Sequence, residues 1–193
     1  MGFLTGKKFL ITGISSNRSI AYGIAKACAR EGAELALSYN NERFKERVQG
    51  FADEFGAGQV IKLDASSDES IDLAALELAN RWTDGFDGFV HSIGWAPRES
   101  ISGSFLEGAS REGFLSAMNV SVYSYIAMAK RMVPLMAGHK ASLLTLSYLG
   151  GEKSFPITTR WDFAKQRLNL LPAILLLTSP ARHSRQHTLL RPD

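Results

Sequence analysis

Five short apolar runs, separated by stretches of helical spacing, constrain the fold of this chain more than any other feature. The apolar runs occupy residues 8–12, 34–39, 59–63, 88–92 and 142–147. Each run is too short for a buried helix and lies between turn-forming residues, which indicates β-strands. Stretches with helical spacing fill the intervals, at residues 19–30, 42–55, 67–82 and about 110–132. The sequence therefore predicts a β-α-β-α-β-α-β-α-β order.

Strands that are apolar throughout and alternate with helices predict a parallel sheet covered on both faces, with right-handed crossovers. The fold class expected is α/β, a Rossmann-like doubly wound parallel sheet with a truncated or aberrant C-terminal part. In the last helical stretch, Phe114, Met118, Val122 and Ile126 recur every four residues. This spacing predicts that the four side chains form one buried stripe.

The length of 193 residues suits one compact domain, and 45% hydrophobic with 21% charged residues is typical of a soluble globular protein. The first residues, MGFLTGKKFLITG, lack the apolar core of a secretory signal, and no segment has the length of a membrane span. We therefore expect a cytoplasmic protein that does not bind a membrane. The single cysteine, Cys28, falls at a helical core position, and we interpret it as a packing residue.

The net charge of +3 raises the question of a nucleic-acid partner, but its distribution argues against one. Residues 157–193 contain six basic and two acidic side chains, so this segment carries +4 and residues 1–156 carry −1. Elsewhere the chain has no stripe of interleaved aromatic and basic residues of the kind that single-strand binders use. We expect no nucleic-acid partner.

The segment after the first apolar run, GISSNRSIAYG, has features of a phosphate-binding turn. Gly13 ends the strand, where a glycine lets the backbone turn sharply and approach a ligand. Ser19, Ile20 and Ala21 begin the helix, so we expect their N–H groups and the positive end of the helix dipole to face a pyrophosphate. Gly23 would let the helix pack closely on the sheet. The spacing differs from G-x-G-x-x-G, so a tight turn capped by Ser19 is the alternative.

Polar residues follow the second and third strands, where dinucleotide-binding folds contact the ribose and the base. Asn40 could hydrogen-bond a ribose hydroxyl, whereas Glu42 and Arg43 favour opposite cofactors, so these residues leave NADH and NADPH both open. Asp64 is a candidate partner for the adenine amino group. The alternative is that Asp64 caps the following helix.

The fourth strand ends in HSIG, at the same expected edge of the sheet. Gly94 would let a cofactor ribose lie against the backbone of Ile93. We interpret His91 as a structural residue rather than as an acid or a base.

Three segments of the chain resemble one protein family. These segments are MGFLTGKKFLITGISSNRSIAYGIAKACAREGAELALSY, FDGFVHSIGWAP and LLTLSYLGGEKSFP. They are similar to the bacterial NADH-dependent enoyl-[acyl-carrier-protein] reductases of the FabI type, in the short-chain dehydrogenase/reductase superfamily, and the similarity runs from Met1 to about Pro156. The resemblance implies hydride transfer from NADH to a trans-2-enoyl thioester on acyl carrier protein, in the elongation cycle of fatty-acid biosynthesis. It also implies a homotetramer and favours NADH over NADPH.

The resemblance further implies roles for particular residues. Hydride addition leaves negative charge on the thioester oxygen, which hydroxyl donors stabilise, while a cation holds the nicotinamide ribose. Tyr148 matches the first of two family tyrosines, Lys165 matches the family lysine, and Ala96 falls where the acyl chain is contacted. The family's cofactor contacts carry over to Gly13, Ser19, Ile20, Asn40, Asp64, Ala65, Ile93 and Lys165.

Thr158 stands where the family has its second tyrosine, seven residues before Lys165. A threonine hydroxyl is shorter than a phenol and far less acidic, so we do not expect it to replace that donor. Loss of one such donor typically costs about 3–4 kcal/mol of transition-state stabilisation. Two functions stay open: an enoyl-[acyl-carrier-protein] reductase of lowered or no activity, and a catalytically inactive dinucleotide-binding fragment or pseudoenzyme.

Residues 157–193 depart from the preceding pattern: they have no continuous helical period and end in a polar stretch without expected partners. A second reading frame offers an explanation. AILLLTS can be encoded so that reading one nucleotide earlier gives Arg-Tyr-Leu-Ala-Ala-Asp-Leu, and PARHSRQH so that reading one nucleotide later gives Pro-His-Gly-Ile-Arg-Val-Asn. Both resemble segments that the family has after its lysine. We interpret residues 1–156 as a dinucleotide-binding domain and residues 157–193 as a frameshifted tail that replaces its end; a divergent natural tail is the alternative.

Overall fold

The computed structural model describes residues 2–58, 60–101, 109–148 and 185–191. The strands are β1 (Lys8–Ile11), β2 (Glu34–Tyr39), β3 (Val60–Lys62), β4 (Gly88–His91), β5 (Ser142–Tyr148) and β6 (Arg185–Arg191). The α-helices are α1 (Ile20–Arg30), α2 (Glu42–Phe55), α3 (Asp68–Arg81), α4 (Arg98–Ile101), α5 (Arg111–Met118) and α6 (Ser124–Met132). A π-helix, η1 (Asn119–Tyr123), joins α5 to α6, and a 3₁₀-helix, η2 (Val133–Met136), follows α6.

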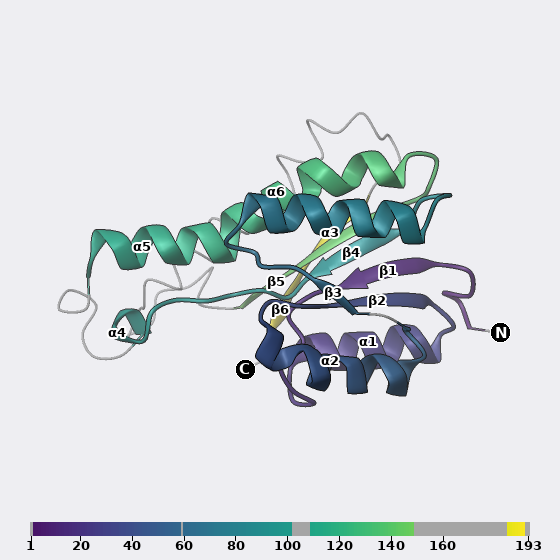
Figure 1. Ribbon diagram of the computed structural model, residues 1–193, viewed down its shortest axis with the longest axis horizontal. Coiled ribbons are helices and arrows are strands. Elements are labelled where there is room, and N and C mark those ends of the chain that lie inside the picture. The colour runs from purple at the N-terminus through teal and green to yellow at the C-terminus, as the bar shows by residue number, and fades with distance from the viewer. Residues whose placement is uncertain (1, 59, 102–108, 149–184, 192–193) are drawn as a thin grey trace.

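The strands form one parallel sheet in the order β3-β2-β1-β4-β5-β6. Figure 1 shows α1 and α2 on one face of this sheet and α3 and α6 on the other. The predicted doubly wound α/β fold is therefore confirmed. The strand order reverses between β1 and β4, and folds of this kind bind ligands beyond the carboxyl ends of the strands at such a point.

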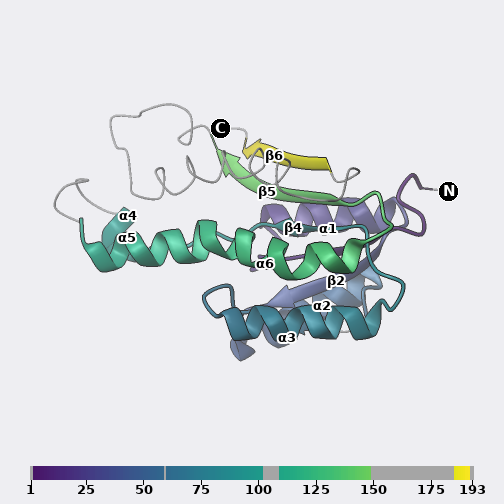
Figure 2. The same cartoon turned by 90° about the horizontal axis from the view of Figure 1, so that it is seen from above.

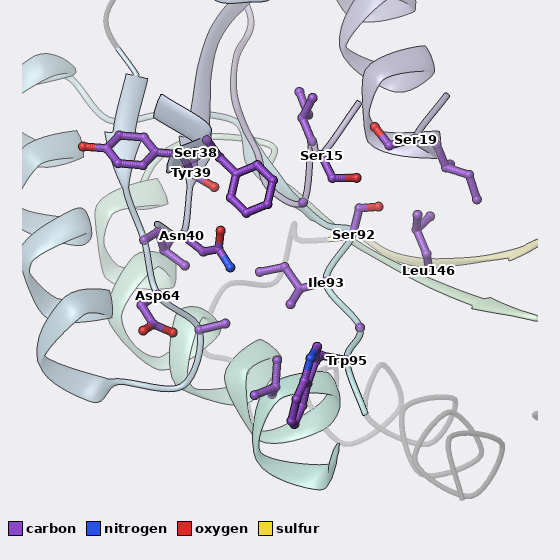
Figure 3. Close-up of a pocket in the computed structure, with 18 of the residues that line it drawn as sticks. Ser15, Ser19, Ser38, Tyr39, Asn40, Asp64, Ser92, Ile93, Trp95 and Leu146 are labelled. Carbon is purple, nitrogen blue, oxygen red and sulfur yellow. The ribbon is translucent and has the colours of Figure 1, made fainter. Parts of the chain in front are cut away.

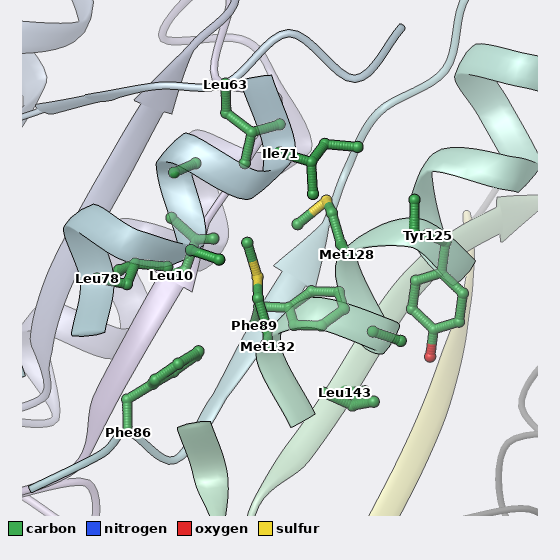
Figure 4. Close-up of a cluster of buried hydrophobic side chains, with 14 of the residues drawn as sticks. Leu10, Leu63, Ile71, Leu78, Phe86, Phe89, Tyr125, Met128, Met132 and Leu143 are labelled. Carbon is green, nitrogen blue, oxygen red and sulfur yellow. The ribbon is translucent and has the colours of Figure 1, made fainter. Parts of the chain in front are cut away.

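Two hydrophobic clusters hold the layers together, one on each face of the sheet. Leu10 and Phe89 face α3 and α6, where they pack with Met128 and Met132 (Figure 4). On the opposite face the side chain of Ile11 packs in the cluster that α1 and α2 cover. Neighbouring strand residues such as Leu10 and Ile11 point to opposite faces, so both are completely buried. Within the described ranges, no helix is both long and apolar enough to cross a bilayer.

The long helical stretch predicted at residues 110–132 is present, but its predicted buried stripe is only half right. Val122 is buried and Met118 packs against the core, whereas the two ends of the stripe are exposed. The residues expected to be buried are Phe114, Met118, Val122 and Ile126. Phe114 is 43% exposed and Ile126 37%, whereas Tyr125 and Met128 are completely buried. A π-turn fits one extra residue into a helical turn, so η1 shifts the phase of the buried face. A four-residue spacing counted across η1 therefore follows no single face.

A network of charged side chains closes the end of the sheet opposite the carboxyl ends of the strands. The Asp87 carboxylate, 3% exposed, accepts hydrogen bonds from Lys7 Nζ at 2.7 Å and from the Lys8 amide at 2.9 Å. His139 Nδ1 lies 3.3 Å from Asp87 Oδ1, and His139 Nε2 lies 2.7 Å from the Asp84 carbonyl oxygen. Burial alone would raise the pKa of Asp87, but the hydrogen bonds from these donors outweigh it and hold the pKa below its usual range. The network ties β1 to the segments that precede β4 and β5.

Residues 185–191 correct one expectation about the end of the chain. Sequence analysis leaves this polar segment without partners, whereas the structure pairs it as β6 along β5, from Ser142 opposite Arg185 to Tyr148 opposite Arg191. Figure 2 shows the two strands side by side at the edge of the sheet. An unpaired strand edge offers a row of N–H and C=O groups to any extended segment, and this pairing depends little on side-chain type. Thr158 and Lys165 lie outside the described residues.

Candidate functional site

A cavity of about 680 Å³ lies at the carboxyl ends of the strands, a volume in the usual range for small-molecule sites. Figure 3 shows it between the end of β2, where Asn40 lies, and the start of α1, where Ser19 lies. The wall includes seven of the residues for which sequence analysis predicts cofactor contacts: Gly13, Ser19, Ile20, Asn40, Asp64, Ala65 and Ile93. Ala96 does not belong to the described wall, although its neighbour Trp95 does. Ser147 also lines the cavity, whereas the side chain of Tyr148 lies outside the described part of the structure.

The loop between β1 and α1 needs Gly13 for a reason that the sequence did not reveal. Gly13 has φ +82°, and a Cβ on it would lie 2.0 Å from the carbonyl oxygen of Ser92. The loop that follows β1 and the segment that follows β4 therefore approach each other at backbone distance. This close approach brings the first turn of α1 and the residues after β4 to the same cavity.

Ser19 caps α1, as the tight-turn alternative predicts. Its Oγ accepts a hydrogen bond from the Tyr22 amide at 3.3 Å and donates one to the Ser16 carbonyl at 2.7 Å. The Ser19 N–H also donates to the Ser16 carbonyl, at 3.1 Å, so this N–H is not free as expected, and a contact between Ser19 and a cofactor stays a prediction. The amides of Ile20 and Ala21 lie in the first turn, where an α-helix provides them with no internal acceptor.

The expected packing role of Gly23 is wrong. This residue is exposed on α1, and a Cβ built on it would meet nothing within 4 Å among the described residues. Ala21 and Ala25, both completely buried, make the close contact between α1 and the sheet. Small side chains, rather than a missing side chain, permit that contact.

Asp64 follows β3 and lies at the same end of the cavity as Asn40 (Figure 3). Its Oδ1 accepts hydrogen bonds from the Ser66 amide at 2.9 Å and the Ser66 hydroxyl at 2.7 Å. The cap of α3 is instead Ser67, whose Oγ accepts from the Ser70 amide at 3.2 Å. The alternative that Asp64 caps this helix is therefore wrong, because the helix begins one turn later than that assignment requires.

Glu42 and Arg43, which favour opposite cofactors in the sequence, each contact another side chain in the structure. Glu42 Oε1 lies 3.1 Å from Lys62 Nζ. The Arg43 guanidinium stacks over the Phe44 ring at 4.6 Å, and Phe44 is a wall residue that sequence analysis missed. No local pattern distinguishes Phe44 from a residue that packs α2 against the sheet.

His91 has the structural role that sequence analysis predicts. It is completely buried, and its Nε2 lies 2.8 Å from Ser124 Oγ. Ser124 Oγ donates its own hydrogen to the Val120 carbonyl, so it accepts from Nε2–H. Nδ1 then faces the Thr145 hydroxyl at 3.4 Å. A neutral imidazole satisfies both contacts.

The cavity wall has little charge. Arg18 and Asp64 are the charged side chains of the described wall, Arg18 in the loop before α1 and Asp64 after β3. In the part of the chain that the structure describes, no cluster of three or more His, Cys, Asp or Glu side chains is placed to hold a metal ion. The arrangement fits an elongated ligand with an anionic group near α1 and a polar ring near Asp64, which is the chemistry of a dinucleotide.

Comparisons with known proteins agree with this geometry. A family model described as enoyl-(acyl carrier protein) reductase matches residues 13–173. The chain is 51% identical over 175 residues to the NADH-dependent FabI of Haemophilus influenzae and 48% identical over 168 residues to that of Escherichia coli. These matches cover 91% and 87% of this chain, and the chain spans 66% and 63% of the relatives' length.

Solved structures resemble this fold closely. The enoyl-[acyl-carrier-protein] reductase (NADH) of Aquifex aeolicus superposes with a TM-score of 0.94 at 41% identity, over 100% of this chain and 75% of that one. The reductase of Anaplasma phagocytophilum, solved in complex with NAD, gives a TM-score of 0.90 at 33% identity, over 97% and 71% of the two chains. Sequence, fold and cavity together establish that the chain belongs to the enoyl-(acyl carrier protein) reductase family.

Proposed function

We propose that the cavity binds NADH and that the chain reduces a trans-2-enoyl thioester carried on acyl carrier protein. One observation carries the proposal: residues from four separate strand–helix connections, each expected to contact the cofactor, line one cavity. The relatives named above are NADH enzymes, and one solved neighbour holds NAD. These findings also support NADH over NADPH.

Each part of the wall has a chemical role in this proposal. The amides of Ile20 and Ala21, at the positive end of the α1 dipole, donate to the diphosphate. The Asn40 carboxamide hydrogen-bonds the adenine ribose, and the Asp64 carboxylate, held by Ser66, accepts from the adenine amino group. Bound NADH supplies the hydride.

The reaction needs further groups that the proposal takes from the family resemblance. Tyr148 ends β5 beside the wall residue Ser147, and its hydroxyl would donate to the developing negative charge on the thioester oxygen. Lys165 would hold the nicotinamide ribose, and Ala96 would contact the acyl chain. These three assignments stay predictions.

We further propose that the chain acts in the cytoplasm and assembles as a homotetramer, as the family resemblance implies. Exposed apolar side chains on neighbouring helices support an interface between copies: Leu73 and Leu76 on α3, Leu115 on α5 and Ile126 on α6. Light scattering coupled to size-exclusion chromatography measures the number of copies in the assembly. A monomer at micromolar concentration would contradict the homotetramer.

The second candidate function is a dinucleotide-binding module without catalysis. Thr158, in place of the expected tyrosine, favours it, because one of the two hydroxyl donors is replaced by a shorter and less acidic group. The two candidates share the cavity and differ in turnover alone.

Fluorescence titration with NADH and NADPH, followed by NADH oxidation with a crotonyl thioester, tests both candidates. Binding of NADH with turnover supports the reductase. Binding without turnover supports the module. A chain that is folded by circular dichroism and binds neither nucleotide contradicts both.

A further inference from the structure

We propose that Arg18 is the cation that neutralises the diphosphate of the bound dinucleotide and so fixes its position in the cavity. The inference rests on the proposed function and adds to it a binding residue that sequence analysis and the family resemblance do not assign. Arg18 lies one residue before the cap of α1, on the loop that lines the cavity.

The balance of charge in the wall favours such a residue. A dinucleotide diphosphate carries two negative charges, and the N-terminus of α1 offers the equivalent of about half a positive charge. Among the charged side chains of the described wall, Asp64 adds a negative charge and Arg18 alone adds a positive one. Without Arg18, a diphosphate in the cavity would be only partly neutralised.

Hydrogen bonds fix the backbone of the loop and do not involve the guanidinium of Arg18. Ser16 Oγ accepts from the Arg18 amide at 3.2 Å, and the Ser16 carbonyl accepts from the Ser19 amide and hydroxyl. The Ser15 carbonyl accepts from Arg47 Nη1 at 3.1 Å. These bonds fix the loop backbone, while no ion pair between described residues includes Arg18, which is exposed.

The neighbouring cations are committed to other contacts. Arg47 holds the loop through Ser15, and Arg43 stacks on Phe44. Neither belongs to the described wall. A guanidinium matches two phosphate oxygens at once, whereas an ammonium acts as a single point charge. This difference predicts that lysine at position 18 is a partial substitute.

Arg18→Gln and Arg18→Lys, with Arg30→Gln as the matched control, test the inference. Arg30→Gln removes the same charge from the opposite end of α1, where Arg30 pairs with Glu31. Three ligands separate the contributions: NADH, ADP-ribose, which retains the diphosphate, and adenosine, which has none. Dissociation constants come from fluorescence titration for NADH and from displacement of NADH for the other two.

We expect Arg18→Gln to weaken the binding of NADH and of ADP-ribose by the same factor, about tenfold at low salt. The affinity for adenosine should stay unchanged. The factor should shrink at high salt, because screening weakens exposed charges. Arg18→Lys should lower the affinity for NADH and ADP-ribose by about threefold, a loss between those of wild type and the Gln variant. Arg30→Gln should bind all three ligands like wild type.

Two results would overturn the inference: NADH affinity that Arg18→Gln leaves unchanged, or adenosine affinity that falls as far as that of ADP-ribose. Either result spares the proposed function, since wild type would still bind NADH. A folded wild-type chain that binds none of the three ligands contradicts the proposed function and the inference with it.

Discussion

Gly13 and the carbonyl oxygen of Ser92 are in such close contact that no side chain fits between them: a Cβ on Gly13 would lie 2.0 Å from that oxygen. The contact joins the loop that starts α1 to the segment that carries Ile93 from the end of β4. Both segments line the cavity, so their spacing sets its width.

Gly13→Ala should therefore destabilise the fold and abolish NADH binding. The substitution adds the strain of a side chain at φ +82° to a backbone clash, together about 2–5 kcal/mol. Gly138→Ala is the control, because Gly138 has φ +85° but nothing within 4 Å of its Cβ position among the described residues. It should lose about 1 kcal/mol from strain alone. Urea unfolding measures both, and equal losses would contradict the role of Ser92.

His139 should make stability depend on pH. Its two ring nitrogens face two acceptors, the Asp84 carbonyl and the Asp87 carboxylate, so both carry hydrogen only in the imidazolium form. The bond to Asp84, then that to Asp87, raise the pKa of His139 against the opposing effects of burial and of Lys7. A raised pKa stabilises the fold below the ordinary value of about 6.5, and this stabilisation is lost as pH rises through the folded value.

We expect the unfolding free energy of wild type to fall between pH 6 and pH 8.5, and that of His139→Gln to fall less. Urea unfolding at the two pH values measures the difference. Hydrogen bonds hold the pKa values of Asp84 and Asp87, the carboxylates nearest His139, below their usual range, so neither carboxylate titrates across this interval. A variant that follows the wild-type pH profile would assign the dependence to another group.

Tyr125→Phe should leave stability unchanged or raise it. Tyr125 is completely buried, its hydroxyl has no hydrogen-bond partner within the described part of the chain, and burial raises its pKa. Removing an unpaired buried hydroxyl relieves a desolvation penalty of about 1–3 kcal/mol, which lost contacts partly offset. Ser124→Ala is the contrast, because the Ser124 hydroxyl bonds both His91 and the Val120 carbonyl; it should lose about 1–2 kcal/mol. Thermal unfolding ranks the two variants, and the opposite order would be evidence against this account.

Thr158→Tyr should not restore full reductase activity by itself. The substitution supplies the phenol that the family resemblance implies, but a hydroxyl donor is effective only when its surroundings hold it against the developing charge. The family match extends to residue 173, and the frameshift interpretation of the tail predicts that the surroundings beyond it are incomplete. Steady-state NADH oxidation with a crotonyl thioester measures the effect, with binding of NADH as the control. Activity equal to that of the Escherichia coli relative would refute the prediction.

The first five strands could be predicted because each is a local apolar run, and the long helices because each is a local repeat; β2 and α2 have the predicted bounds. The cap at Ser19 is also a local signal and was confirmed. Seven of the predicted site residues meet in one cavity, whereas their contacts to a cofactor stay predictions. The domain boundary at residue 156 also stays a prediction.

The errors arise where the structure depends on distant partners. β6 pairs through backbone groups, for which its side chains give no pattern. Gly13 is required by Ser92, far away in the sequence, and the absence of a Gly23 contact follows from how α1 lies on the sheet. The π-turn places two adjacent side chains against distant parts of the structure. Ser121 Oγ accepts a hydrogen bond from the Trp95 amide and donates one to the Trp95 carbonyl, both at 3.0 Å, while Val122 packs in the core.

The extra residue in η1 is absorbed inside one turn of the helix. Because a π-turn fits one more residue into a turn than an α-turn does, deleting one residue between Asn119 and Tyr123 would restore a regular α-helix and leave α5 in nearly the same orientation relative to α6. Ser116 would still line the cavity from α5. A chain one residue shorter in this segment could therefore build the same wall, and its core-facing positions would then recur with one helical spacing along the whole stretch.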